Sequence, residues 1–353
     1  MKQTVVLKVD AQQPDIEKVR VAAGIIREGG LVAFPTETVY GLGADALNSK
    51  AVSGLFEAKK RPIDNPPIIH VENINDVYKL AKQVPAKAVK LMKEFWPGPL
   101  TLVFKRSENV PDVTVAGLDT VAVRMPQHAV ALSLIKESRC PIAAPSANLA
   151  GKPSPTSAEH VLTDLNGRID AVLDCGSTRI GVESTVLDLS VDPAMVLRPG
   201  GTSLEALKRV LGDVKLHPFV VAEKELAIEN TRSPGMKHRH YAPKAPVIVV
   251  EGSVSPVMAT VKSLISEYWL QDKRVGVLAT AETAWAYEAD VVKSLGSRRK
   301  VDAMAANLFK LLREFDEENV DVIIAESVPT EGLGLAVMNR LRKASGYNIV
   351  KVG

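Results

Sequence analysis

The feature that most constrains this chain is the repeated alternation of helix-like and strand-like segments. Apolar residues recur at helical spacing from Ile16 to Glu28, Gly29-Gly30 ends that helix, and a short buried strand is predicted over 31–35. Further strands are predicted over 1–10, 100–105, 121–125, 171–174 and 184–189. Further helices are predicted over 49–59, 74–81, 129–137 and 203–211. Such a pattern predicts an α/β domain with a twisted, mixed sheet.

The length of the chain predicts a second domain, because 353 residues exceed what one hydrophobic core usually organises. Helical or strand periodicity is lost over 217–245, which we interpret as a linker. Beyond it, strands are predicted over 247–250, 275–278 and 320–325, and helices over 256–270, 301–315 and 335–345. We therefore expect a large domain over 1–216 and a small, doubly wound Rossmann-like domain over 246–353.

The charge balance and the cysteine content exclude several classes of protein. The 44 basic and 41 acidic side chains leave a net charge of +3, so bulk electrostatics do not demand a nucleic-acid partner. Cys140 and Cys175 are too few for a disulfide framework and lack the spacing of a zinc site. We expect neither a signal peptide nor a membrane span, and hence a cytoplasmic protein.

Three segments rich in small polar or basic residues follow predicted helices and strands, in the order Pro35 to Gly43, Lys59 to His70 and Pro141 to Thr156. Ligands of open α/β sheets bind at strand ends, and a cluster of cations at an element edge suits a polyphosphate. Each segment also has a plain structural reading, as a turn or as a basic helix C-terminus. Ser146 lacks a nucleophile elbow, so anion binding is the better functional reading of its loop.

Two arginines lie in or beside apolar strands, where an unpaired guanidinium is costly. Arg124 and Arg198 each need an anion, which is either an internal carboxylate or the carboxylate of a small substrate. The six histidines show no metal-ligand spacing, so no tightly held protein-bound metal is expected.

Taken together, these segments resemble the YrdC-type threonylcarbamoyl-AMP synthases in their long, two-domain form. The resemblance covers nearly the whole chain and rests on the order and spacing of short motifs. These are FPTETVYGLG, KKRPIDNPPIIH, WPGPLT, GLDTVAVRMP, APSAN, GVEST, LRPG and the linker SPGMKHRHYAP. The family fold is a twisted, mixed-sheet catalytic domain around a positively lined cavity, with a smaller Rossmann-like domain in the long members.

The resemblance implies two sets of binding residues and a lid. The residues implied to surround L-threonine are Thr36, His70, Arg124, Ala144 and Ser184. The residues implied for ATP are Lys59, Arg61, Asn65, Thr120, Ser146, Asn148, Ser154 and Arg198. In the linker, the candidates for lid contacts over the cavity are Arg239, His240 and Tyr241.

The implied reaction joins L-threonine, bicarbonate and ATP into threonylcarbamoyl-AMP and pyrophosphate. Magnesium should enter with the phosphates of ATP, since no protein-bound metal is expected. The product would pass to a downstream transferase complex that modifies tRNA, and transient contact with tRNA is compatible with this role. Positioning and charge neutralisation dominate such chemistry, which agrees with many cations and hydroxyls and no Ser-His-Asp arrangement.

Other functions stay open at this point. A carbamoyl-phosphate-dependent adenylating carbamoyltransferase shares this chemistry, but its relatives carry acylphosphatase-like and zinc-finger portions that are missing here. A double-stranded RNA or tRNA binder fits a basic cavity, although no RNA module is recognisable. A nicotinamide dehydrogenase would need a glycine fingerprint where Glu251-Gly252-Ser253 stands.

Overall fold

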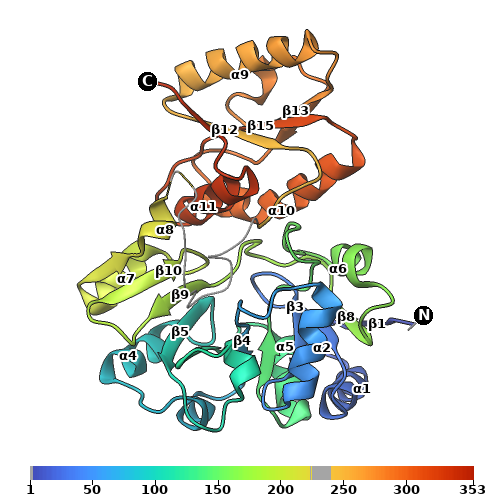
Figure 1. Cartoon of the computed structure of the whole chain (residues 1–353), viewed down its shortest axis with the longest axis vertical. Helices are drawn as coiled ribbons and strands as arrows, with labels where there is room; N and C mark the ends of the chain where they lie inside the picture. Colours follow the sequence, from blue (N-terminus) through green and yellow to red (C-terminus); the bar gives the residue numbers. More distant parts are fainter. Residues whose placement is uncertain (1–2, 223, 225–239) are drawn as a thin grey trace.

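The computed structural model describes residues 3–222, 224 and 240–353. It contains two β-sheets, an eleven-stranded one in the first part of the described chain and a five-stranded one in the second (Figure 1). The expected fold class is confirmed. No helix among the described residues is long and apolar enough to cross a membrane.

The large sheet is mixed, as the sequence predicts. Its strands follow the order β1-β8-β2-β3-β7-β4-β6-β5-β9-β10-β11 over the described residues. Their bounds are β1 Val5–Lys8, β2 Val32–Phe34, β3 Gly41–Asp45, β4 Ile68–His70, β5 Leu100–Lys105, β6 Thr120–Arg124, β7 Ile142–Ala144, β8 Ala171–Asp174, β9 Thr185–Asp188, β10 Ala194–Arg198 and β11 Val214–Leu216. It contains both parallel pairs, such as β4 with β6, and antiparallel pairs, such as β5 with β6.

Helices cover this sheet and end close to its functional loops. They are α1 Ile16–Arg27, α2 Ser49–Lys59, α3 Val77–Leu80, α4 Ala86–Phe95, α5 Ala129–Ser138, α6 Ala158–Leu165, α7 Leu204–Leu211 and α8 Pro218–Val221. The Asn48 side chain caps α2 by accepting from the backbone N–H groups of Lys50 and Ala51. The predicted helix over 74–81 is shorter, because a 3₁₀ turn occupies Ile74–Asp76 and α3 makes a single turn.

The small sheet is parallel throughout the described chain, in the order β14-β13-β15-β12-β16. Its elements are β12 Val247–Glu251, α9 Val254–Trp269, β13 Val275–Ala279, β14 Val291–Ser294, α10 Val301–Glu317, β15 Val322–Glu326, α11 Gly334–Ala344 and β16 Ile349–Lys351. Helix α9 covers the outer face, whereas α10 and α11 lie between this sheet and the first domain (Figure 1).

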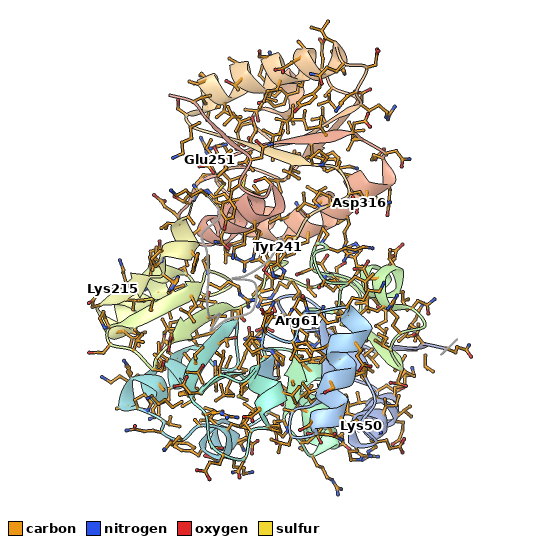
Figure 2. The ribbon with its side chains drawn as sticks, in the orientation of Figure 1. Lys50, Arg61, Lys215, Tyr241, Glu251 and Asp316 are labelled. Atoms are coloured by element: carbon orange, nitrogen blue, oxygen red, sulfur yellow. The ribbon has the colours of Figure 1, made fainter. Side chains whose placement is uncertain are left out.

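The two halves of the chain share a hydrophobic cluster. Val39 and Val182 from the first half pack in the same cluster as Phe309 of α10 and Leu341 of α11. A Cβ added at Gly181 would lie 2.4 Å from the backbone of Ala306 in α10, so close approach of the two halves requires glycine there. In Figure 2, Arg61 and Tyr241 lie near this junction, whereas Lys50, Lys215 and Asp316 lie toward the outside.

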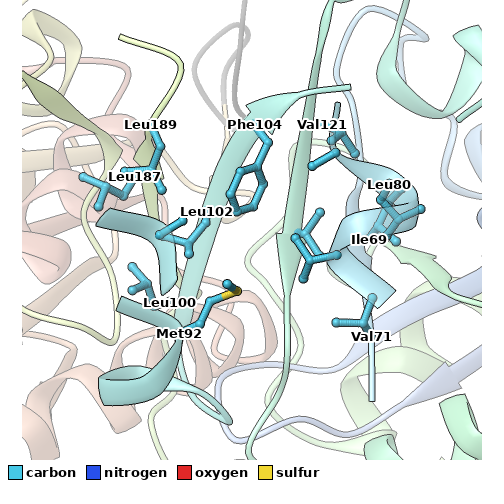
Figure 3. Close-up of a cluster of buried hydrophobic side chains, with 14 of the residues drawn as sticks. Ile69, Val71, Leu80, Met92, Leu100, Leu102, Phe104, Val121, Leu187 and Leu189 are labelled. Carbon is cyan, nitrogen blue, oxygen red and sulfur yellow. The ribbon is translucent and has the colours of Figure 1, made fainter. Parts of the chain in front are cut away.

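The main core of the first domain lies beside its central strands. Alternate side chains of β5, Leu100, Leu102 and Phe104, point into one cluster with Leu187 of β9 and Met92 of α4 (Figure 3). Because successive side chains of a strand alternate between faces, the opposite positions can serve other contacts. Thr101, on the opposite face of β5, is fully buried and hydrogen-bonds Ser184.

Candidate active site

One cavity collects the residues singled out in the sequence. Its lining comes from the loop after β2, the end of α2, the ends of β4, β6, β7 and β10, and the segment that enters the second domain. It includes every predicted threonine- and ATP-binding residue except Asn65 and Thr120, together with His240 and Tyr241. Arg239 lies outside the described residues. Segments far apart in the sequence therefore converge on one site.

Lys59 organises the APSAN loop, which runs from Ala144 to Asn148. Its ammonium group is buried and donates hydrogen bonds to the backbone carbonyls of Ser146, at 2.5 Å, and of Asn148. Burial, with Arg61 nearby, holds the pKa of Lys59 well below its usual value. The lysine thus fixes the shape of the loop from inside.

Arg61 offers an unused donor to the cavity. Its Nε donates to the backbone carbonyl of Asn65 at 3.1 Å, whereas no described residue hydrogen-bonds its buried Nη2. Burial lowers the pKa of Arg61 to about 10, and Arg198 contributes to the decrease, although Tyr241 opposes it. A buried guanidinium with a spare donor is stabilised by an anionic ligand.

Arg124 already has an internal carboxylate partner in this structure. Its Nη2 lies 2.6 Å from Oε2 of Glu37, and both side chains are buried. Its Nη1 donates to Oγ1 of Thr38 at 3.1 Å, and its Nε donates to the backbone carbonyl of Gly98 at 3.2 Å. Of the two readings of Arg124, the internal pair is present, and a substrate carboxylate would share the guanidinium with it.

His70 is held neutral beside Arg124. Its Nδ1 lies 3.1 Å from the backbone carbonyl of Ile68, and its ring meets that of Phe34 edge-on. Burial, followed by the charge of Arg124, lowers the pKa of His70 to about 3. At neutral pH the imidazole is therefore uncharged. Thr36, in the same wall, uses its hydroxyl to donate to the backbone carbonyl of Val39 at 2.6 Å.

Arg198 and Ser184 also line the cavity and are joined by hydrogen bonds. Nη2 of Arg198 donates to the carbonyl oxygen of Ser184 at 3.0 Å and to its hydroxyl at 3.2 Å. The Ser184 hydroxyl also lies 2.8 Å from that of Thr101. Burial lowers the pKa of Arg198, and Glu183 partly opposes this effect.

Glu183 is a site residue that sequence reasoning missed. It lies within the GVEST motif, yet only the adjacent Ser184 was assigned a role. Its carboxylate accepts from the Ser154 hydroxyl at 2.6 Å and from Nε of Arg340 at 2.8 Å. Although burial raises it, Arg340 and Arg198 lower the pKa of Glu183 to about 2, so the group is ionised.

Tyr241 joins the cavity to the second domain. Its ring stacks on Phe309 at 5.2 Å, and the Arg340 guanidinium lies 5.4 Å from the ring centre. Next to it, the backbone N–H of Ala242 donates to the carbonyl of Gly151 at 2.9 Å. Burial raises the pKa of the Tyr241 hydroxyl. The phenol is thus a fixed wall of the site in this state.

Asn65 and Thr120 are buried nearby but do not line the cavity. No described residue hydrogen-bonds the amide oxygen or nitrogen of Asn65, so its side chain could turn to a ligand without losing a hydrogen bond. Thr120 begins β6 and pairs with Lys105 of β5.

The cavity is small in this state and contains no recognisable metal cage. Its volume is about 60 Å³, whereas pockets that hold drug-sized ligands measure about 300–1,000 Å³. The cavity in this state is therefore smaller than a nucleotide needs. Within the described ranges, no group of three or more His, Cys, Asp or Glu side chains is placed to hold a metal ion. Both cysteines are free thiols.

Comparison with known proteins agrees with this site. Residues 24–200 match the Sua5/YciO/YrdC family, described as telomere recombination, and residues 202–346 match the C-terminal domain of threonylcarbamoyl-AMP synthases. The threonylcarbamoyl-AMP synthase of Pyrococcus abyssi is 56% identical over 95% of this chain and 96% of its own length. That of Bacillus subtilis is 52% identical over 94% and 93%.

A solved structure extends the likeness to three dimensions. The crystal structure of P. abyssi Sua5 complexed with L-threonine has a TM-score of 0.94 and 54% identity, over 99% of this chain and 100% of that one. Sequence and fold agree from end to end. The chain therefore belongs to the Sua5/YciO/YrdC family, in the form that carries the Sua5-type C-terminal domain.

Proposed function

We propose that this chain is an L-threonylcarbamoyl-AMP synthase, which converts L-threonine, bicarbonate and ATP to threonylcarbamoyl-AMP and pyrophosphate. The observation that carries the proposal is a single buried cavity whose two ends differ in chemistry. One end holds Lys59 and Arg61, with a guanidinium donor left over, and the other holds Arg124 and the neutral His70. The first end suits phosphates and the second suits a small zwitterion.

At the phosphate end, the proposed ligand is ATP with its magnesium ion. Arg61 and Arg198 supply positive charge, and the Lys59-braced loop supplies the Ser146 hydroxyl and backbone groups. Preorganised donors of this kind stabilise charge that develops on the α-phosphate during displacement. Magnesium would enter as part of the substrate in this proposal and would neutralise charge on the phosphates.

At the other end, the proposed ligand is L-threonine, the molecule bound in the P. abyssi relative. Its carboxylate would share the Arg124 guanidinium with Glu37, while Thr36, Ala144 and Ser184 surround the side chain and the amine. Neutral His70 adds no charge beside that carboxylate. A fixed arginine fork selects a planar carboxylate by two parallel hydrogen bonds.

The proposed chemistry needs alignment rather than a protein nucleophile. Bicarbonate takes up a proton and loses water to give carbon dioxide. The threonine nitrogen bonds to the carbon of that carbon dioxide and loses a proton, which gives a carbamate. A carbamate oxygen then bonds to the α-phosphorus as the bond to the pyrophosphate oxygen breaks. Holding both reactants in one cavity makes a bimolecular step effectively unimolecular, which lowers the activation free energy by about 7–11 kcal/mol in favourable cases.

The product is a mixed anhydride, which water would hydrolyse. We infer that it passes in the cytoplasm to a transferase complex that modifies tRNA, with at most transient contact between this chain and tRNA. The buried Tyr241, which lines the cavity, supports a partly shielded product, because exclusion of water prevents hydrolysis of reactive intermediates.

The test is pyrophosphate release by the purified protein with magnesium and ATP, with L-threonine and bicarbonate each added or omitted. Release that requires both supports the synthase. Release with carbamoyl phosphate instead of threonine would assign the carbamoyltransferase reaction. No release, together with salt-dependent binding of double-stranded RNA, would favour an RNA-binding role.

A further inference from the structure

The second domain inserts a fully buried cation behind the cavity. Arg340 lies on α11, the helix that faces the first domain, and none of its side chain is exposed. Its Nε donates to Oε2 of Glu183 at 2.8 Å, and its Nη2 donates to the backbone carbonyl of Pro199 at 2.9 Å. One side chain therefore ties together the two segments that precede β9 and follow β10.

The link continues to a residue of the cavity wall. The other oxygen of Glu183 accepts from the hydroxyl of Ser154 at 2.6 Å, and Ser154 is fully buried. Glu183 and Ser154 line the cavity, whereas Arg340 does not. Arg340 can therefore influence a ligand only through the groups it holds.

The negative charge of Glu183 is unfavourable in a site that binds an anion. It is the one carboxylate among the described residues that line the cavity, whose other charged members include Lys59, Arg61 and Arg198. A bare carboxylate there would repel phosphates and draw Arg198 toward itself. Arg340 offsets that charge from the side away from the cavity, so that Arg198 need not be the only counterion.

We propose that Arg340 is a positioning residue for nucleotide binding: the second domain uses it to neutralise Glu183 and to hold Ser154 and Arg198 in place for the phosphates of ATP. The second domain is then a working part of the catalytic cavity. This inference rests on the proposed function in one respect, since it takes the incoming anion to be ATP.

The direct test is the affinity of the full chain for magnesium and α,β-methylene-ATP, measured by calorimetry. This analogue cannot be cleaved at the bond that the proposed reaction breaks. Arg340→Gln should raise its Kd by about 5- to 150-fold, the usual range for coupling between separate sites. The KM for L-threonine should change much less, because that ligand lies near Arg124 in the proposed arrangement.

A matched control lies on the same helix. Arg342 makes a two-pronged ion pair with Glu251 inside the second domain, with contacts of 2.6 and 2.8 Å. Arg342→Gln removes a stronger, two-pronged ion pair from the same helix but leaves the cavity untouched, so its Kd should equal that of the wild type. Equal Kd values for the Arg340→Gln and Arg342→Gln proteins would overturn the proposal.

Rescue separates a charge effect from simple loss of packing. Arg340→Gln combined with Glu183→Gln leaves no unpaired carboxylate, and one amide can donate to the other while still accepting from Ser154. The double variant should therefore bind the analogue more tightly than Arg340→Gln alone. If Arg340→Gln fails to fold and the double variant folds, the same compensation is established; if neither folds, or if both bind equally weakly, Arg340 is only a structural contact.

The dependence of binding on pH gives a second readout. Besides Arg340, the groups that face Glu183 are Arg198, Tyr241 and Lys343, and burial lowers the pKa of Lys343 to about 7. Without Arg340 the pKa of Glu183 should rise, so the repulsion should fade as the pH is lowered and the carboxyl is protonated. The Kd of Arg340→Gln divided by the Kd of the double variant should therefore decrease as the pH is lowered. Lys343 is present in both proteins, so its titration does not change this ratio. A ratio that stays constant with pH would contradict the proposal.

The outcomes also separate this inference from the proposed function. A wild-type protein that makes pyrophosphate while Arg340→Gln binds the analogue normally keeps the function and overturns the inference. A wild-type protein that binds the analogue but makes no pyrophosphate loses the function, and the Kd comparison still decides the role of Arg340. A wild-type protein that binds no nucleotide overturns both.

Discussion

Arg124→Met tests whether the buried pair with Glu37 supports the fold of the first domain. The Arg124 and Glu37 side chains are only 4% and 2% exposed, and their charged atoms lie 2.6 Å apart. Replacing arginine by the shorter methionine keeps the apolar stem of the side chain but leaves a buried carboxylate without its ion-pair partner. The expected effect is therefore mainly electrostatic.

The magnitude follows from the geometry. At 2.6 Å, two unit charges attract by about 6 kcal/mol at an effective dielectric constant of about 20. The cost of desolvating both ions offsets much of this attraction, and removal of one partner of a buried pair usually costs about 3–5 kcal/mol. We expect Arg124→Met to lower the free energy of unfolding by that amount, which is a large part of the usual total of about 5–15 kcal/mol.

The assay is urea unfolding followed by tryptophan fluorescence. Trp96, in the first domain, is 7% exposed, whereas Trp269 and Trp285 are 43% and 82% exposed. The fluorescence change should therefore follow mainly the unfolding of the first domain. Adding Glu37→Gln to Arg124→Met removes the buried charge and should recover about 2–3 kcal/mol. It should not recover the KM for L-threonine if Arg124 also binds the substrate.

Strict additivity of the two substitutions would refute this reasoning. It would mean that Glu37 and Arg124 do not interact energetically despite their separation of 2.6 Å. A double variant that recovers both stability and the KM for L-threonine would keep the ion pair and refute the proposed substrate contact. The two readouts thus test the two readings of Arg124 separately.

Three further predictions concern single positions. Gly200→Ala should abolish activity and destabilise the protein by about 1–3 kcal/mol or more in urea unfolding, since its Cβ would lie 2.2 Å from the backbone oxygen of Glu183. Gly54→Ala, in α2 with no heavy atom within 4 Å, should stabilise the protein by about 0.5–1 kcal/mol in the same assay. Tyr241→Ala should depress threonine-dependent pyrophosphate release, and Tyr241→Phe, which keeps the stacking on Phe309, should retain more activity; equal rates would exclude a role for the ring. Because the pKa of Glu183 is lowered to about 2 from 4.5, its ionised form contributes about 3 kcal/mol to the free energy of unfolding; this contribution is present above pH 4.5 and lost as the pH falls through 2. Glu183→Gln should make the free energy of unfolding less dependent on pH in that range, and an unchanged dependence would assign it to other carboxyl groups.

The sequence predicts elements whose signals are local. The bounds predicted for α2, β5 and β8 are those of the structure. In α2 the apolar period agrees with the Asn48 cap, and in β5 an apolar run ends at a charged residue. Local pattern and tertiary environment coincide in these elements.

Elements that depend on long-range pairing escape such analysis. Strands β11 and β16 have three residues each, too few to show a clear apolar pattern. They pair with β10 and β12, which are not their immediate neighbours in the sequence. No helix is predicted over 158–165, where α6 forms with Ser157 as its cap; its eight residues follow a stretch rich in proline and serine. The structure of such a short segment depends on tertiary packing, so its composition alone does not predict it.

The residues of the candidate site likewise include some that the sequence predicts and some that it does not. Lys59, Arg61 and Ser146 lie in motifs with a recognisable order, and the resemblance leads to them. Arg340 has no such signal, because its partner Glu183 is 157 positions away and the two meet only after both domains have folded. An arginine on an amphipathic helix reads as a solvated side chain until its burial is known.

Three internal carboxylates hold cations of the site and its surroundings. Glu37 pairs with Arg124, Glu183 pairs with Arg340, and Asp164 pairs with Lys152 and Arg313, each at 2.6–2.8 Å. Removing one partner of a buried pair leaves an uncompensated charge, which is strongly destabilising. Lys59 is held differently, by the backbone carbonyls of Ser146 and Asn148.

Only some of these cations face the cavity. Arg124 and Lys152 line it, whereas Arg340 does not, and Arg313 joins α10 to the first domain through Asp164. In the proposed arrangement, a substrate carboxylate that reaches Arg124 must therefore compete with Glu37. Glu37→Gln should then destabilise the protein more without L-threonine than with it, and the difference in unfolding free energy with and without L-threonine would measure that competition.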